Sequence, residues 1–364
     1  MANVKLQLVA NHGTSQSAWN KAPADVATIA EKLGFVRVAD GCFQLGQFSF
    51  ARRVVRKLRF EHWLNRLCWK LEIEALRKRF AVGGELLLQH PLPGSWTFDL
   101  TNIDDIGSLK RKGVKITVLV HDVGALRGSS NEVGGSGDLS WEKRLFGVAD
   151  KLIVHNGRMR DFVVNMGVQG KVVPLGVFDY LVAPDIGLIR RQINGRNSVL
   201  LVGGFGPVFS KYVRELKTIS GIQWVLYGHM YDEALMGAAN VQFRGKFDSD
   251  RPPLDCDCSF GLVWNGESIK TCSGVIGEYS RFCNNHKMSL YFAMGLPVIV
   301  WKEAAVAEFV EENHVGLVVD SLMDVHIVLN KITEEEYKVL RENVARLSEE
   351  LRAGAFTQKA LSQD

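Results

Sequence analysis

A lysine stands at the start of an expected helix, where a positive charge is normally unfavourable. Asn284 or Asn285 can cap a helix that begins near His286, which puts Lys287 in its first turn. A cation there opposes the helix dipole, at a cost of about 0.3–1 kcal/mol on an exposed helix. A bound anion would reverse that cost, because free N–H groups, the dipole and the ammonium would all face it. The pattern therefore predicts a pyrophosphate site; the alternative is a solvated lysine.

A histidine and an aspartate follow another apolar run. The apolar part of an expected strand, Ile116–Val120, ends in His121 and Asp122, with Arg127 close behind. Either His121 or Asp122 can take a proton from an attacking hydroxyl group. Arg127 can hold a phosphate or orient the carboxylate. The spacing predicts acid–base chemistry at this strand end; the alternative is a helix cap by Asp122 beside a structural histidine.

Two more expected strands end in turns that contain glycine. Gly204-Phe205-Gly206 begins like a dinucleotide-binding loop, but Phe209 stands where the third small residue should be, which excludes the hydride-transfer motif. Such a turn still lets backbone approach a phosphate or a sugar. Asn265 lies in the turn after Gly261–Trp264 and can form hydrogen bonds to a ligand there. For both turns the alternative is an ordinary connection without a ligand.

Metal-binding patterns are weak in this sequence. Asp248-Ser249-Asp250 and Asp255-Cys256-Asp257 are D-x-D tripeptides, through which one class of nucleotide-sugar transferase binds a divalent cation. Neither follows an apolar strand directly, and about one match is expected by chance in a chain of this length. Cys256-x-Cys258 lacks a second cysteine pair at zinc spacing. We therefore expect no metal site and no cofactor.

The composition is that of a globular protein. The 364 residues exceed one ordinary domain of roughly 100–200 residues, so two domains are expected. Hydrophobic residues at 46% and charged residues at 23% exclude a disordered or fibrous chain. A net charge of +4 is too small to imply a nucleic-acid partner. The sparse cysteines, the lack of a signal-peptide pattern and the lack of a long apolar segment predict a cytoplasmic protein.

Short apolar runs alternate with amphipathic helices along nearly the whole chain. This alternation predicts an α/β fold of two Rossmann-like parallel-sheet domains facing a cleft. A break near Pro184 to Arg196 separates residues 1–183 from residues 184–364, and the last helix either stays in the second domain or packs back on the first. Thr333 followed by Glu334-Glu335-Glu336 predicts a capped final helix to about Leu351. The expected strands are Val4–Val9, Gly84–Gln89, Val114–Val120, Lys151–Val154, Lys171–Pro174, Ser198–Val202, Gln223–Tyr227, Val241–Arg244, Gly261–Trp264, Val298–Trp301 and Leu317–Asp320.

A strongly basic helix is expected at Arg52–Arg79. It holds ten lysines and arginines against three glutamates, and apolar residues that include Trp63 recur at helical spacing. Such a helix suits an anionic membrane surface. The alternative is a helix that packs on the core and exposes a solvated basic face.

Taken together, these segments resemble the GT-B glycosyltransferases of bacterial surface-glycan assembly. That group includes the β-1,6-galactofuranosyltransferases of O-antigen synthesis and the glucosyltransferase that extends GlcNAc on serine-rich adhesins. The His286-Lys287-x-Ser289-x-Tyr291 block and the Phe178-Asp179-Tyr180-Leu181 segment are the more specific matches. The other matching segments follow the family's order: Leu88-Gln89-His90-Pro91, Val120-His121-Asp122 with Leu126-Arg127, Ala149-Asp150, Val154-His155-Asn156 with Met159, Phe260–Gly266 and Gly295–Trp301.

The resemblance implies a UDP-sugar donor in the C-terminal half and an acceptor held by the N-terminal half. It places Lys287 and the following helix at the diphosphate, and Tyr227 near the nucleotide. The expected catalytic residues, taken from the strand end described above, are Asp122, His121 and Arg127. The expected donor-binding set is Lys287, Ser289, Asn285, Arg281, Tyr227, Gly204, Phe205, Arg244 and Asn265.

We therefore expect a metal-independent enzyme that moves a galactofuranosyl, galactosyl or glucosyl residue to a hydroxyl group of a glycan acceptor. The acceptor is a free, lipid-linked or protein-linked saccharide. Lys287, helped by Arg281 or Arg244, stabilises the leaving UDP, and Asp122 or His121 deprotonates the acceptor. Peripheral contact with the cytoplasmic face of the inner membrane and a homo-oligomer are left open. The alternatives are a sugar-nucleotide epimerase or hydrolase on the same fold and a non-catalytic glycan-binding partner.

Overall fold

The computed structural model divides the chain into two compact units. The structure describes residues 4–9, 18–39, 60–80, 83–91, 100–127, 139–189, 197–206, 210–229, 235 and 237–363. The first unit comprises Met1–Ser15, Val26–Val154 and Arg160–Pro174. The second unit comprises Gln16–Asp25, His155–Met159 and Leu175–Asp364. Helices α1 and α6, whose bounds follow, therefore contribute residues to both units.

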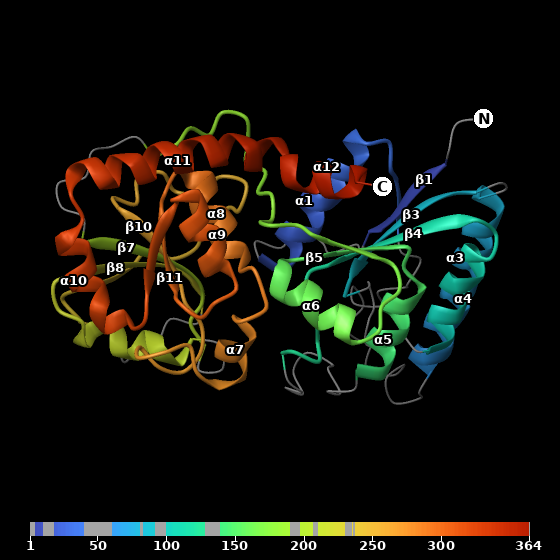
Figure 1. The fold of residues 1–364 in the computed structure, drawn as a ribbon, viewed down its shortest axis with the longest axis horizontal. Helices are drawn as coiled ribbons and strands as arrows, with labels where there is room; N and C mark the ends of the chain where they lie inside the picture. The colour runs from blue at the N-terminus through green and yellow to red at the C-terminus, as the bar shows by residue number, and fades with distance from the viewer. Residues whose placement is uncertain are drawn as a thin grey trace. The chain divides into compact units, whose positions relative to one another are not determined.

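The first unit contains a six-stranded parallel sheet in the order β2-β1-β3-β4-β5-β6. This is a doubly wound arrangement whose strand order reverses between β1 and β3. Figure 1 labels β1, β3, β4 and β5 of this sheet. The strands are β1 (Lys5–Val9), β2 (Val36–Ala39), β3 (Gly84–His90), β4 (Val114–Val120), β5 (Lys151–Val154) and β6 (Lys171–Pro174). The helices between them are α1 (Ala18–Lys32), α3 (Phe60–Arg79), α4 (Leu100–Lys110), α5 (Leu139–Val148) and α6 (Gly157–Asn165).

The second unit contains another six-stranded parallel sheet, in the order β12-β11-β10-β7-β8-β9. Read along the chain, this is the strand order of a dinucleotide-binding Rossmann sheet, which reverses between β7 and β10. The strands are β7 (Ser198–Gly204), β8 (Gln223–His229), β9 (Val241–Phe243), β10 (Phe260–Val263), β11 (Val298–Trp301) and β12 (Gly316–Val319). The helices are α7 (Gly274–Tyr279), α8 (His286–Met294), α9 (Val306–Asn313), α10 (Val325–Lys331), α11 (Glu334–Ala353) and α12 (Ala355–Ser362), with 3-10 helices η2 (Lys211–Thr218) and η4 (Leu322–Asp324).

The central strands are covered on both faces. Leu86, Leu87 and Leu88 of β3 are all fully buried, as is every residue of β11. Parallel strands with helices on both sides read as continuous apolar runs, and this is why the sequence pattern locates them well. The prediction of two Rossmann-like parallel-sheet domains is confirmed by these sheets. Among the described residues, no helix combines the length and the apolar character that crossing a bilayer requires.

The start of α11 is fixed by a reciprocal pair of hydrogen bonds. The Thr333 hydroxyl accepts from the Glu336 backbone N–H at 3.2 Å, and the Thr333 backbone N–H donates to Glu336 Oε2 at 2.7 Å. The predicted cap is thus confirmed as a capping box. Because α11 packs against α8, this cap helps to support the helix that carries Lys287.

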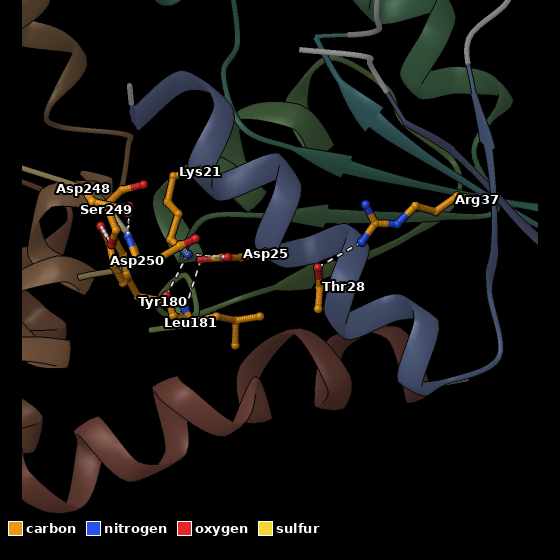
Figure 2. A network of polar contacts seen from close by, with 9 residues as sticks. All are labelled: Lys21, Asp25, Thr28, Arg37, Tyr180, Leu181, Asp248, Ser249 and Asp250. Carbon is orange, nitrogen blue, oxygen red and sulfur yellow. Dashed lines mark hydrogen bonds and ion pairs between the residues drawn. The ribbon is translucent and has the colours of Figure 1, made fainter. Parts of the chain in front are cut away.

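A buried lysine ties the first half of α1 to other parts of the second unit (Figure 2). Lys21 Nζ donates to Asp25 Oδ1 at 2.7 Å and to Asp250 Oδ1 at 2.6 Å. It also donates to the Leu181 carbonyl oxygen at 2.6 Å and lies 5.0 Å from the centroid of the Tyr180 ring. All three ammonium protons therefore have acceptors, as a buried charge requires. Burial nevertheless raises the pKa of Asp25 to about 6.

Candidate active site

The sheet of the second unit reverses its strand order between β7 and β10, where ligands of such folds bind. Strand β7 ends at Gly204, and β10 is followed by Trp264 and Asn265. Strands β7 and β10 are hydrogen-bonded neighbours, with Phe260 opposite Val199. Three residues expected from the sequence, Gly204, Phe205 and Asn265, therefore lie at the carboxyl ends of two adjacent strands.

The turn after β10 depends on a glycine. Gly266 has φ +101°, and a Cβ there would lie 2.2 Å from the Ser273 carbonyl oxygen. Gly266 also pairs with Ser210 in a short parallel bridge, and the Ser210 hydroxyl donates to the Gly204 carbonyl oxygen at 2.9 Å. These contacts join the turn after β7 to the turn after β10. A larger residue at 266 is excluded by the close backbone approach.

Helix α8 begins at the predicted residue, but its predicted side-chain cap is wrong. Asn285 occupies the N-cap position in an extended conformation and forms no capping hydrogen bond with its side chain. Asn284, which is 5% exposed, donates through Nδ2 to the carbonyl oxygens of His155 at 2.8 Å and Gly176 at 2.6 Å. The amide of Asn156 donates to Asn284 Oδ1 at 2.7 Å. Asn284 therefore anchors the segment before α8 instead of capping the helix.

Lys287 lies against the turn that follows β10. Its Nζ donates to the Trp264 carbonyl oxygen at 3.0 Å and to Asn265 Oδ1 at 3.2 Å. The other end of the Asn265 amide donates to the Ser280 hydroxyl at 3.1 Å. Burial lowers the pKa of Lys287 to about 8. The structure thus brings Lys287 and Asn265 into direct contact beside β7 and β10, the two strands between which the strand order reverses.

The two expected arginines differ in their surroundings. Arg281 forms ion pairs with Glu278, at 2.6 Å, and with Glu303, and its guanidinium lies 4.6 Å from the Trp301 ring centroid. Two carboxylates already compensate its charge, which makes it a weaker anion ligand than Lys287. Arg244 follows β9 and donates to Gln242 Oε1 at 2.9 Å.

The remaining expected donor residues lie on the other side of β7 or in the core. Burial raises the pKa of Tyr227, which ends the apolar part of β8 and lies beside the Arg244 guanidinium. Phe205 is buried, and its backbone N–H donates to the His229 carbonyl oxygen at 2.9 Å. Ser289 is buried in the first turns of α8. Among the nine expected donor residues, side-chain hydrogen bonds join Lys287 to Asn265 and Tyr227 to Arg244.

In the first unit, His121 and Asp122 follow β4 as expected. The His121 ring, through Nε2, lies 2.7 Å from Gln89 Oε1, and its backbone N–H donates to the His90 carbonyl oxygen at 2.7 Å. Asp122 Oδ2 accepts from Arg127 at 2.7 Å in a half-buried ion pair. Arg127 therefore orients the carboxylate, which is one of the two roles considered for it. The structure brings all three expected catalytic residues into one turn.

Two buried residues near this turn escaped the sequence analysis as functional candidates. Glu142 of α5 and His90 at the end of β3 are each 1% exposed, and His90 Nε2 lies 3.1 Å from Glu142 Oε1. A glutamate on an amphipathic helix is normally predicted to be a surface residue. The sequence therefore does not indicate that Glu142 is buried or has a functional contact. His90 lies in a matched segment, but its spacing from residue 142 indicates no contact.

The first D-x-D tripeptide is held by protein contacts. Asp250 pairs with Lys21, and its backbone N–H donates to Asp248 Oδ1 at 2.9 Å. An ammonium thus occupies the position beside Asp250 that a divalent cation would need. Within the part of the chain that the structure describes, no group of three or more histidines, cysteines, aspartates or glutamates is arranged to hold a metal ion.

The chain matches known proteins over most of its length. The N-terminal and C-terminal domain models of the glucosyltransferase 3-like family match residues 6–177 and 199–364. The chain is 31% identical over 251 residues to the β-1,6-galactofuranosyltransferase WbbI of Escherichia coli (strain K12), covering 68% of this chain and 71% of WbbI. It is 25% identical over 371 residues to glucosyltransferase 3 of Streptococcus gordonii, covering 98% and 97% of the two chains.

Solved structures show the same fold. HepE of Anabaena, solved in complex with UDP, superposes with a TM-score of 0.60 at 12% identity, covering 98% of both chains. The fold is therefore GT-B, as predicted from the resemblance.

Proposed function

We propose that this chain, which belongs to the glucosyltransferase 3-like family of bacterial glycosyltransferases, moves a hexosyl residue from a UDP-sugar to a hydroxyl group of a glycan acceptor. The donor sugar is a galactofuranosyl, galactosyl or glucosyl group. WbbI is named as a galactofuranosyltransferase and the streptococcal relatives as glucosyltransferases. HepE, which has the same fold, was crystallised with UDP and with UDP-glucose.

The single observation that carries the proposal is the contact of Lys287 with the turn after β10. Its ammonium lies 3.2 Å from Asn265 Oδ1, at the end of α8 where the helix dipole is positive. A diphosphate at this place would meet a cation, a helix N-terminus and an amide side chain. These groups are already positioned before the ligand arrives, so they stabilise charge that develops on a leaving UDP without reorganising.

In the proposed mechanism the first unit supplies the base. Asp122 or His121 removes the proton from the acceptor hydroxyl while its oxygen attacks the anomeric carbon and the bond to UDP breaks. Arg127 keeps the Asp122 carboxylate oriented through the 2.7 Å ion pair. Lys287 balances the negative charge that accumulates on the β-phosphate. No divalent cation is required in this scheme, since the ammonium takes that part.

The direct test is UDP release from a panel of UDP-sugars. UDP-galactofuranose, UDP-galactose and UDP-glucose are each supplied with and without a saccharide acceptor, and each is also scored by thermal shift, because a ligand that binds the native state raises its stability. UDP release that needs the acceptor and survives EDTA is expected. Release of free sugar or of an epimer without acceptor would instead indicate a hydrolase or an epimerase. Loss of turnover with EDTA would overturn the metal-independent mechanism.

UDP binding is expected to weaken as the pH rises above about 8. Burial lowers the pKa of Lys287 to about 8, whereas a bound diphosphate favours the ammonium and raises that pKa. A group whose pKa rises on binding takes up a proton, so Kd should increase by up to about tenfold per pH unit above pH 8. Titration calorimetry between about pH 7 and about pH 9.5 measures this slope.

The matched control for the pH dependence is Lys287→Met, which keeps the length of the side chain but cannot be charged. Its Kd for UDP should be higher at every pH and nearly flat over the same range. The phosphates of UDP are fully ionised above a second pKa of about 6, so they contribute no slope there. A variant that kept the wild-type slope would assign the pH dependence to another group.

The proposal extends to contact with an anionic membrane through α3. The predicted basic helix Arg52–Arg79 is realised as α3 from Phe60, and residues 51–59 lie outside the described residues. On its outer face Leu71 is 65% exposed beside the exposed Lys70, and Lys78 continues the same face. Exposed leucines flanked by lysines suit a bilayer with anionic headgroups.

Vesicle flotation tests this contact. The protein should float with vesicles that contain phosphatidylglycerol, less so in high salt, and not with pure phosphatidylcholine. Leu71→Glu with Lys78→Glu should abolish flotation while leaving transfer to a water-soluble acceptor unchanged. If the wild-type protein ignores anionic vesicles at low salt, the membrane contact is wrong.

A further inference from the structure

We propose that Glu142 and His90 are positioning residues that hold the His121–Arg127 turn in its reactive arrangement. The inference rests on the proposed function, because it takes this turn as the source of the base. Neither residue touches the reacting atoms in this scheme; both act through the turn.

The Glu142 carboxylate is a buried acceptor for the turn's backbone. The N–H of Gly124 donates to its Oε1 at 2.7 Å, and the N–H of Ala125 donates to its Oε2 at 3.2 Å. The turn itself is closed by the N–H groups of Leu126 and Arg127, which donate to the Val123 carbonyl oxygen. Glu142 therefore satisfies backbone N–H groups at the start of this turn, much as a cap does at a helix. Glu142, which follows the last residue of the turn by 15 positions, thus fixes the path of the chain just after Asp122.

His90 contacts the turn and Glu142 with two different groups. Its Nε2 lies 3.1 Å from Glu142 Oε1, and its carbonyl oxygen accepts the backbone N–H of His121 at 2.7 Å. Because the carboxylate can only accept, the His90 proton must lie on Nε2. The ring is packed edge-on against Trp141 and Phe146, with centroids 5.2 and 5.3 Å away. Through its backbone carbonyl and its ring, His90 thus links the turn's first residue to the carboxylate that holds the middle of the turn.

The burial of Glu142 argues for a specific role. An ionised carboxylate that is 1% exposed is costly unless it is hydrogen-bonded, and here it has three N–H donors. A glutamine has the same shape, but only one of its two terminal atoms can accept. It would turn an NH₂ group toward one of the backbone N–H groups and displace the turn. Small misplacements of a reacting group cost up to about 100-fold in rate.

A displacement of this turn would affect the reaction, because the turn carries both candidate bases. His121 and Asp122 are the first two residues after β4, and the Gly124 and Ala125 bonds to Glu142 follow directly. Asp122 is also paired with Arg127 at the end of the turn. A change in the path between residues 123 and 126 therefore moves both the proton acceptor and the arginine that orients it.

The test is a double-mutant cycle in the full chain. Glu142→Gln should lower kcat by about 10–100-fold while Kd for UDP stays within about twofold, because the donor-binding unit is untouched. Combined with the variant that removes the base, Asp122→Asn or His121→Ala, whichever is the inactive one, Glu142→Gln should cause less than about a threefold further loss, since residues that act through one group are not additive. The matched control is Glu72→Gln, a buried glutamate of α3 in the same unit, which should leave kcat unchanged in both backgrounds.

The result that overturns the inference is equal loss of kcat from Glu142→Gln in both backgrounds, or no loss in either. If Glu142→Gln fails to fold, His90→Phe keeps an aromatic ring against Trp141 and Phe146 but removes the donor to Glu142. It should lower kcat by about three- to tenfold with the same non-additivity. Failure of the proposed function is separate: there the wild-type protein itself neither binds UDP nor releases it in the presence of an acceptor.

Discussion

Lys287→Ala is expected to lower kcat by at least about 10²–10³-fold, the cost of removing one fixed group that stabilises transition-state charge. The loss follows from the place of the ammonium, 3.0 Å from the Trp264 carbonyl oxygen and at the first turn of α8. The residual groups, the helix terminus and Asn265, cannot replace a full positive charge. The variant should still fold, because the lysine is half-buried and loses two hydrogen bonds, which together contribute about 1–3 kcal/mol. Steady-state kinetics with a saturating UDP-sugar measure the effect.

Lys302→Ala is the matched control for Lys287→Ala. Lys302 also lies in the second unit, directly after β11, but it is exposed and paired with Asp320 at 3.3 Å. Exposed ion pairs contribute little, so this variant should keep both its melting temperature and its kcat. Lys287→Met separates the lost charge from the lost volume and should be as inactive as Lys287→Ala. Near-normal turnover in Lys287→Ala with intact folding would refute the diphosphate role.

The strands of this fold were largely predictable because most of them are buried on both faces. Val114–Val120 and Val298–Trp301 have the same bounds in the sequence pattern and in the structure. Each is a run of apolar, mainly β-branched residues with few interruptions, which is the pattern of a central parallel strand. Thr333 was predictable for a different reason: a capping box is encoded within four adjacent residues.

One edge strand and one helix near the C-terminus were not predicted, although the other three edge strands, β6, β9 and β12, were. Strand β2 (Val36–Ala39) escaped because it is only four residues long, contains Arg37, and has Val36 58% exposed. Such a short segment gives no continuous apolar run by which a strand can be recognised. Helix α12 was missed as well, because it depends on a distant residue: Asp179 accepts the backbone N–H groups of Phe356 and Thr357 at its start.

The two halves of the candidate site differ in how far the sequence locates them. Lys287 and Asn265 each stood out locally, one by its place in a first helical turn and the other by its place after a strand. Their contact, however, arises because α8 packs against β10, which no local pattern contains. Glu142 shows the limit more strongly, since its three donors come from residues 90, 124 and 125. Only the assembled sheet brings those segments together.

Asp122→Asn is expected to lower kcat by about 10²–10⁴-fold, the usual contribution of a positioned general base. The amide has the shape of the carboxylate, and its oxygen can still accept the hydrogen bond from Arg127, which lies 2.7 Å from Asp122 Oδ2 in the wild-type protein. The conformation of the turn should therefore be kept. The amide cannot take the acceptor's proton. Donor binding belongs to the other unit in this proposal, so Kd for UDP should stay within about twofold of the wild-type value. Kinetics with acceptor, together with UDP calorimetry, separate the two quantities.

Asp104→Asn provides the comparison for Asp122→Asn. Asp104 lies on α4 of the same unit, is exposed, and pairs with Arg144 at 2.6 Å, so the same chemical change there should alter neither kcat nor UDP binding. His121→Ala distinguishes the two possible bases, because only the true base should flatten the acidic limb of the pH–rate profile when it is replaced. If Asp122→Asn turns over normally and His121→Ala does not, the proton goes to His121, whose ring is already held by Gln89 at 2.7 Å.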